Sequence, residues 1–169
     1  MKKYLFLAIA SLMCVASWGQ DYESLCSGKD AFNNIVTLSR HGDGYYFSFT
    51  GLSADVQTKL CLIPLGQSFG DVKEFVDFLI GVHWANRDAN ESVFTRSADG
   101  HLMSVIYEPL KFDDGVVHNV LTIGYKGEEE RPLFAKIHLV VLLRWQMELL
   151  KRVEMRQYVG GLNSYSNTK

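Results

Sequence analysis

The chain has 169 residues, of which 47% are hydrophobic and 21% charged, with 17 basic residues against 19 acidic ones. This length suits one ordinary domain, and the hydrophobic fraction is large enough to build a packed core. The slight acidic excess argues against nucleic-acid binding, which depends on clustered lysine and arginine.

The chain begins with a segment that has the three parts of a secretory signal peptide. Two lysines precede an apolar run over residues 4–16, and Ser17 and Gly19 then supply the small side chains found before a cleavage site. The apolar run is too short to span a bilayer. We therefore predict a signal peptide at 1–19 and a single domain at 20–169, periplasmic or secreted from a bacterium, with no stable membrane insertion after cleavage.

Removal of this segment would change the cysteine and charge counts. Cys14 would be lost with it, and the bulky Met13 before Cys14 disfavours a lipid anchor. The mature chain keeps Cys26 and Cys61 in a compartment where disulfides persist, so we predict a bridge that closes a loop of about 35 residues and contributes about 3–4 kcal/mol. Two buried free thiols are the alternative. Without its two leading lysines the chain has 15 basic residues against 19 acidic ones.

The first half of the mature chain predicts strands followed by a helix. Residues 21–33 have no clear period and are interpreted as a loop or short helical turn. Apolar runs or alternation predict strands at 34–40, 45–50 and 59–65, the first two joined by the Gly-containing turn at 41–44. Asp71 followed by Glu74 indicates a helix start, and helical spacing of apolar residues extends that helix to about Asn86.

The second half repeats this pattern with a longer helix. Strands are predicted at 92–97, 101–108 and 116–125. Acidic residues before Pro132, basic residues near the far end and a pair of glycines beyond it predict a helix from Pro132 to about Tyr158. Apolar residues also alternate over Leu133–Val141, so a strand is the alternative for the first third of this segment.

These elements together predict an α+β fold, with an antiparallel sheet of about six strands packed against two main helices. Four residues recur after a shift of 56 positions: Arg40, Asp43, Gly44 and Ser48 fall on Arg96, Asp99, Gly100 and Ser104. A duplicated β-β-β-α unit would explain the recurrence, and convergent Asp-Gly turns are the alternative.

One short motif invites a catalytic interpretation. Residues Leu38 to Gly42 include an Arg-His-Gly sequence that resembles the signature of the histidine phosphatases, a family with many secreted members. The resemblance covers five residues and implies that His41 accepts the phosphoryl group and that Arg40 binds phosphate. Where the family has its next arginine this chain has Asp43, and the residues after His41 alternate as a strand, which favours a hairpin turn.

Other catalytic or metal-binding patterns are weak. No two histidines have the spacing that places both on one helix face, no Cys-x-x-Cys occurs, and no nucleotide-binding glycine motif is present, so we predict no metal and no cofactor. His101 and His118 could meet across neighbouring strands, with Asp113 or Asp114 as a third group. A small secreted hydrolase that uses this group or His41 is the alternative to a non-catalytic protein.

The remaining features indicate binding. Trp84 and Arg87 lie near the end of the first helix, and Trp and Arg are common in interfaces. The last helix is apolar nearly all round in its early turns, so Val140, Leu143 and Trp145 are candidate contacts. We therefore predict a non-catalytic binding domain whose partner is a protein, a peptide or a second copy of the chain in a homodimer.

Overall fold

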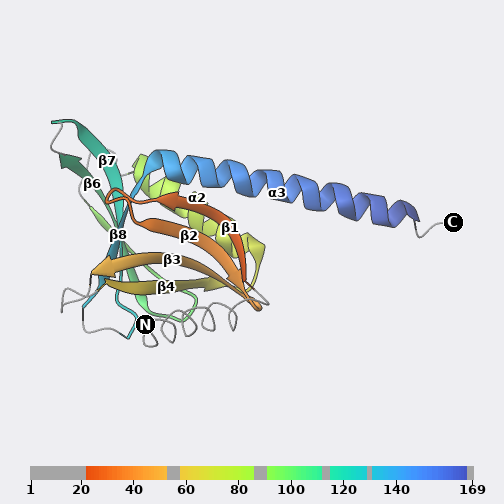
Figure 1. Ribbon diagram of the computed structural model, residues 1–169, viewed down its shortest axis with the longest axis horizontal. Coiled ribbons are helices and arrows are strands. Elements are labelled where there is room, and N and C mark those ends of the chain that lie inside the picture. Colours follow the sequence, from red (N-terminus) through yellow and green to blue (C-terminus); the bar gives the residue numbers. More distant parts are fainter. Residues whose placement is uncertain (1–21, 53–57, 86–90, 112–114, 129–130, 167–169) are drawn as a thin grey trace, which may run out of the picture.

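The computed structural model describes residues 22–52, 58–85, 91–111, 115–128 and 131–166, with side chains up to Met155 except that of Leu52. The predicted signal peptide, Arg87, Asp113 and Asp114 lie outside the described residues. Within the described part the fold is α+β, as predicted, with two four-stranded antiparallel sheets and two helices (Figure 1).

Each sheet is a simple meander in which neighbours along the chain are neighbours in the sheet. The first sheet, named sheet A here, contains β1 (Tyr22–Lys29), β2 (Ile35–His41), β3 (Gly44–Leu52) and β4 (Thr58–Gly66), and α2 (Phe69–Ala85) follows it. The second, sheet B, contains β5 (Ser92–Arg96), β6 (Leu102–Lys111), β7 (Val117–Tyr125) and β8 (Leu133–His138), and α3 (Leu139–Ser166) follows it. The prediction of one sheet with six strands was therefore wrong in strand number and in sheet number.

Strand β1 occupies a segment that we predicted as a loop or helical turn. Leu25 and Cys26 are consecutive in sequence and both buried, because the register between β1 and β2 shifts between Ser24 and Cys26. Such a bulge places two residues of one strand opposite one of the partner and breaks the two-residue period that identifies strands. The sequence pattern was lost for this reason.

The predicted strands at 34–40, 45–50 and 59–65 are confirmed as β2, β3 and β4, within a few residues at each end. His41 pairs with Gly44 across a two-residue turn, and Gly42 has a φ of 57°. Short hairpin turns need this left-handed conformation, which glycine adopts without steric cost. The strands predicted at 92–97, 101–108 and 116–125 are likewise confirmed as β5, β6 and β7.

Helix α2 is confirmed, but its cap lies three residues earlier than predicted. The Asp71 backbone N–H donates to the Ser68 hydroxyl at 3.2 Å, and the Ser68 N–H donates to the Asp71 carboxylate at 2.8 Å. This reciprocal pair is a capping box in which Ser68 is the N-cap and Asp71 occupies the third helical position.

The long helix predicted from Pro132 begins only at Leu139. Leu133, Ala135 and Ile137 are buried and their neighbours are not, which is the alternation of β8 pairing with β7. The strand alternative for this segment is therefore correct. No turn residue separates β8 from α3, because the chain passes directly from His138 into the helix.

The two halves share one order of elements, four strands and then a helix. Helix α2 begins at Phe69 and α3 at Leu139, so corresponding elements are about 70 positions apart. The 56-position shift instead matched the turn after β2 with the turn after β5, which occupy different places in this order. The predicted β-β-β-α unit was therefore one strand too short, and its matched residues are not equivalent.

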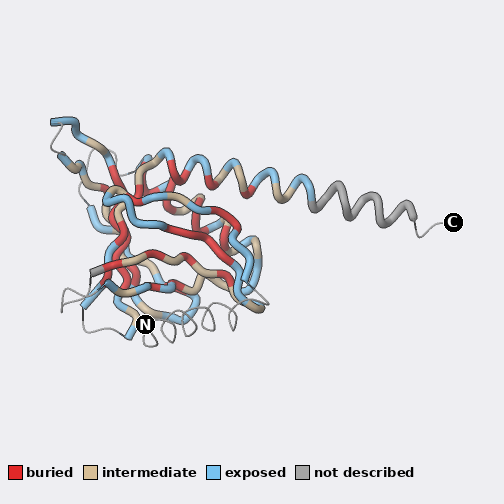
Figure 2. Tube along the Cα trace, viewed as in Figure 1, coloured by how far each residue is buried: buried red, intermediate tan, exposed pale blue. Residues whose placement is uncertain are grey.

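Helix α3 packs onto sheet A as well as onto its own sheet, and it continues past the body of the molecule (Figure 1). Trp145 is fully buried, and its ring lies 6.2 Å from that of Phe47 in β3. A Cβ on Gly28 would lie 2.7 Å from Val141 Cγ1, so only glycine allows α3 this close to β1. Figure 2 shows the buried face of α3 turned to the two sheets.

Two arginines of α3 also reach the outer edge of β1. Arg144 donates to the Ser27 carbonyl at 2.9 Å. Arg152 donates to the Glu23 carboxylate at 2.7 Å and to the Ser24 carbonyl at 3.3 Å. Edge strands present unpaired backbone groups, and these side chains satisfy two of them.

Candidate functional site

His41 and Arg40, the phosphatase candidates, lie at the exposed tip of the β2–β3 hairpin. The Arg40 Nε donates to the Gly42 carbonyl at 2.9 Å, so its guanidinium belongs to the turn. Opposite Arg40 on β1 is Glu23, an acid. A phosphate pocket needs converging cations, and here a carboxylate stands beside the one arginine of the motif.

His101 and His118, the second catalytic hypothesis, are at opposite ends of the β6–β7 hairpin. His118 pairs with Leu110, whereas His101 directly precedes Leu102 at the start of β6. At about 3.3 Å per strand residue these positions are roughly 30 Å apart. The two histidines therefore cannot form one site, because they lie nine residues apart along the same pair of strands.

His118 instead lies beside His138 of β8, with ring centroids 5.5 Å apart. Burial lowers the pKa of His138, and the nearby His118 lowers it further. Among the described residues no group of three or more His, Cys, Asp or Glu side chains is placed to hold a metal ion. A pair of imidazoles alone provides fewer ligands than zinc sites use.

The predicted Cys26–Cys61 disulfide is wrong, because both cysteines are buried and are not bridged to each other. They lie on β1 and β4, the outer strands of sheet A. Three strand spacings of about 4.8 Å separate these strands, beyond the reach of a disulfide. Cys26 Sγ is 3.9 Å from the Trp145 carbonyl, and burial, assisted by Glu148, raises the pKa of this thiol to about 12. It is a packing group and not a nucleophile.

The predicted binding residues divide into two groups. The prediction of Trp145 as a contact residue was wrong, since its side chain is fully buried on the inner face of α3. Trp84 is exposed near the end of α2, and Val140 and Leu143 are exposed on α3. Arg87 lies outside the described residues.

An apolar stripe runs along the exposed side of α3. It consists of Val140, Leu143, Met147 and Leu150, and 70% of Val140 and 58% of Met147 are exposed. The spacing of three, four and three residues keeps the four side chains on one helical face, away from the buried Leu142, Trp145 and Leu149. Met147 and Leu150 were missed, although the same spacing in the sequence would have indicated them. We call this set the α3 stripe.

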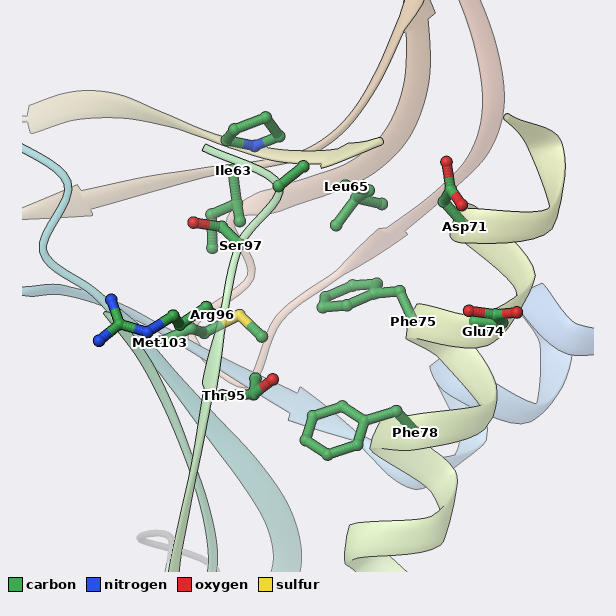
Figure 3. A pocket seen from close by; sticks show the side chains of 12 residues that line it. Ile63, Leu65, Asp71, Glu74, Phe75, Phe78, Thr95, Arg96, Ser97 and Met103 are labelled. Atoms are coloured by element: carbon green, nitrogen blue, oxygen red, sulfur yellow. The ribbon is translucent and has the colours of Figure 1, made fainter. Parts of the chain in front are cut away.

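A groove of about 230 Å³ lies between α2 and β5 (Figure 3). Phe75 and Phe78 point from α2 towards β5, and Met103 contributes from β6. Ile63, Pro64 and Leu65 of β4 close one end. The groove therefore has an apolar floor and a strand as one wall.

Acidic side chains border this groove on the α2 side, where Asp71 and Glu74 lie. Arg96 is on the β5 side, but its guanidinium points away from α2 and donates to the Gly100 carbonyl at 2.6 Å. Hydrogen bonds from Ser68 lower the pKa of Asp71, whose carboxylate belongs to the helix cap. Glu74 is exposed on α2 and remains available to a ligand.

Comparison of the chain with known protein families, with curated proteins and with solved structures gives no match. None of the helices in the described part is long and apolar enough to cross a membrane. The α3 stripe and the groove are the two candidate binding features of the described structure.

Proposed function

We propose that this protein is a non-catalytic binding domain that works in the periplasm or outside the cell, and that the α3 stripe contacts an apolar helix of a partner protein. The observation that carries the proposal is the exposure of four large apolar side chains in a single line. Apolar residues at this spacing are those with which one helix packs against another.

The position of α3 supports a helical partner. The stripe lies on the side of α3 that is turned away from the buried Leu142, Trp145 and Leu149, so a second helix can lie along it without meeting either sheet. The stripe from Val140 to Leu150 is about 15 Å long at 1.5 Å per residue. Glu154 occupies the next position of the same face and ends it. The contact therefore suits about three turns of a partner helix.

The test compares Met147→Glu, on the stripe, with Lys126→Glu, an exposed change in the turn after β7. If the partner is a second copy, light scattering gives a dimer that Met147→Glu dissociates and Lys126→Glu preserves. If the protein is a monomer, a photo-crosslinking residue at 147 gives adducts in the native cells and one at 126 gives far fewer. A monomer with equal crosslinking at both positions contradicts the proposal.

The location outside the cytoplasm is tested separately. The protein isolated from fractionated cells is expected in the periplasm or medium, with an amino terminus near residue 20. An intact Met1 in the cytoplasmic fraction contradicts the proposed location.

A further inference from the structure

Strand β5 is an edge of sheet B, and part of its outer side has backbone groups that point away from the sheet. The Ala98 N–H just after β5 donates to the Pro64 carbonyl of β4 at 3.0 Å, so the open part ends at Arg96. In the β5–β6 hairpin the Ser97 N–H donates to the His101 carbonyl at 3.0 Å, which directs Ser97 towards β6. Backbone groups alternate along a strand, so Thr95 and Val93 also face β6. The N–H and C=O groups of Ser92, Phe94 and Arg96 consequently point outward.

Among the described residues, no helix lies over the edge of β5 as α3 lies over the edge of β1. Strand β1, the first of sheet A, is covered by α3, the helix of the other half. The corresponding cover for β5 would be α2. Helix α2 packs instead mainly on α3, and also on β3, β4 and β6, and the groove lies in the space between it and β5.

The shape of the groove suits a side chain carried by an extended backbone. A volume of about 230 Å³ is below the roughly 300–1,000 Å³ typical of small-molecule sites. Phe75, Phe78 and Met103 form a floor that a large apolar side chain would cover. On the opposite face of β5, Phe94 is 63% exposed and Arg96 points away from α2 (Figure 3).

We propose that β5 binds an extended peptide segment of another protein as an added fifth strand of sheet B. The peptide backbone pairs with the outward groups of Ser92, Phe94 and Arg96. The peptide residue opposite Thr95 points into the groove and is large and apolar, and its neighbours point to the other face, beside Phe94. Main-chain hydrogen bonds and alternating side-chain pockets are the general basis of recognition by strand addition.

A second copy of β5 is a poorer occupant than a foreign peptide. Two-fold pairing of β5 with itself would place only Val93 or Thr95 over the groove, and these short side chains leave the floor uncovered. In the register centred on Thr95, Arg96 would also lie diagonal to its own symmetry mate, and like charges on paired strands are destabilising.

The first test uses a displayed library of random heptapeptides as the probe. Selected peptides are expected to contain no proline. They should have a large apolar residue at the position that enters the groove, with the two neighbouring residues on the opposite face of the peptide strand. Their binding should shift the amide resonances of Phe94 and Arg96 in the purified protein. An empty selection, or shifts centred on Leu60 and Leu62 or on the α3 stripe, overturns the proposal.

N-methylation of the selected peptide provides a test that leaves the protein unchanged. Methyl groups on the nitrogens that pair with β5 should weaken affinity at least tenfold, because each removes a hydrogen bond. Methyl groups on the alternate nitrogens, which face away from β5, should change it less than twofold. Equal effects of the two patterns overturn strand addition.

A matched pair of variants locates the edge. Phe94→Pro removes an outward N–H from β5 and should weaken peptide binding about tenfold. Leu62→Pro removes an outward N–H from β4, an edge strand of sheet A, and should leave binding unchanged. Retention of binding by Phe94→Pro, or its loss in Leu62→Pro alone, contradicts the proposal. A dimer that Phe94→Pro dissociates would identify a second copy as the occupant and also overturn it.

Discussion

The first strands of the two sheets have opposite surroundings. At β1, arginines from α3 donate to the Ser24 and Ser27 carbonyls, and a buried tryptophan fixes the helix in place. At β5, the corresponding helix lies to one side and a groove takes the place of the contact. Natural proteins cover or interrupt exposed strand edges to prevent unwanted pairing. In the described part of the chain, the edge of β5 is instead open beside an apolar groove, and this contrast is the basis for the proposed peptide site.

The largest predicted effect concerns the packing of α3 over the edge of β1. Trp145→Ala should reduce the free energy of unfolding by about 3–5 kcal/mol, because it removes a fully buried aromatic ring between α3 and sheet A. The matched control is Trp84→Ala, an exposed tryptophan, which should cost about 0.5 kcal/mol or less. Urea unfolding measures both. Equal losses would mean that the α3–β1 contact does not stabilise the closed edge.

A smaller effect of the same origin is expected at Gly28. Gly28→Ala places a Cβ 2.7 Å from Val141 Cγ1 and should cost about 1–3 kcal/mol, since α3 would have to move off β1. Gly81→Ala has open space around its Cβ within α2 and should stabilise the protein by up to about 1 kcal/mol. Opposite signs in thermal unfolding support the close approach of α3, and two stabilising alanines would refute it.

The smallest effect concerns the turn after β5. The Tyr125 hydroxyl donates to Asp99 at 2.7 Å, and Ala98 of the same turn donates to the Pro64 carbonyl of β4 at 3.0 Å. Burial, with the bond to Asp99, raises the pKa of Tyr125 to about 12, above its usual 10. The protonated hydroxyl therefore stabilises the folded state fully below pH 10, and this contribution is lost as the pH rises towards 12.

Replacement of this tyrosine tests that assignment. Tyr125→Phe should lose about 1 kcal/mol at neutral pH. The difference from the wild type should narrow as the pH passes from 10 to 12. Urea unfolding over this range measures it, with tyrosine ionisation followed by ultraviolet absorbance. A difference that stays constant with pH would show that the Tyr125–Asp99 bond does not hold this turn.

The regular strands and α2 could be predicted from sequence, because alternation, Gly turns and capping residues are local signals. Strand β1 could not, since its bulge makes Leu25 and Cys26 both buried. The boundary between β8 and α3 was misplaced because no turn residue marks it at His138. Such positions are decided by tertiary contacts that a local pattern does not contain.

The candidate sites divide in the same way. Val140 and Leu143 were identified because an exposed helical stripe has a local period. The groove was missed because its lining comes from α2, β4, β5 and β6, which meet only in the folded chain. The disulfide prediction was wrong because a sequence gives the number of cysteines but not the distance between them across a sheet.

The closing of β1 by α3 has a consequence for the order in which the protein folds. Cys26 and the Trp145 carbonyl are 119 positions apart, and Arg152 is 129 positions from Glu23. Contacts this distant in sequence form slowly, because a long loop must close first. Strand β1 can therefore be covered only after α3 has been synthesised. A truncated chain that lacks α3 would present β1 uncovered to every other strand it meets.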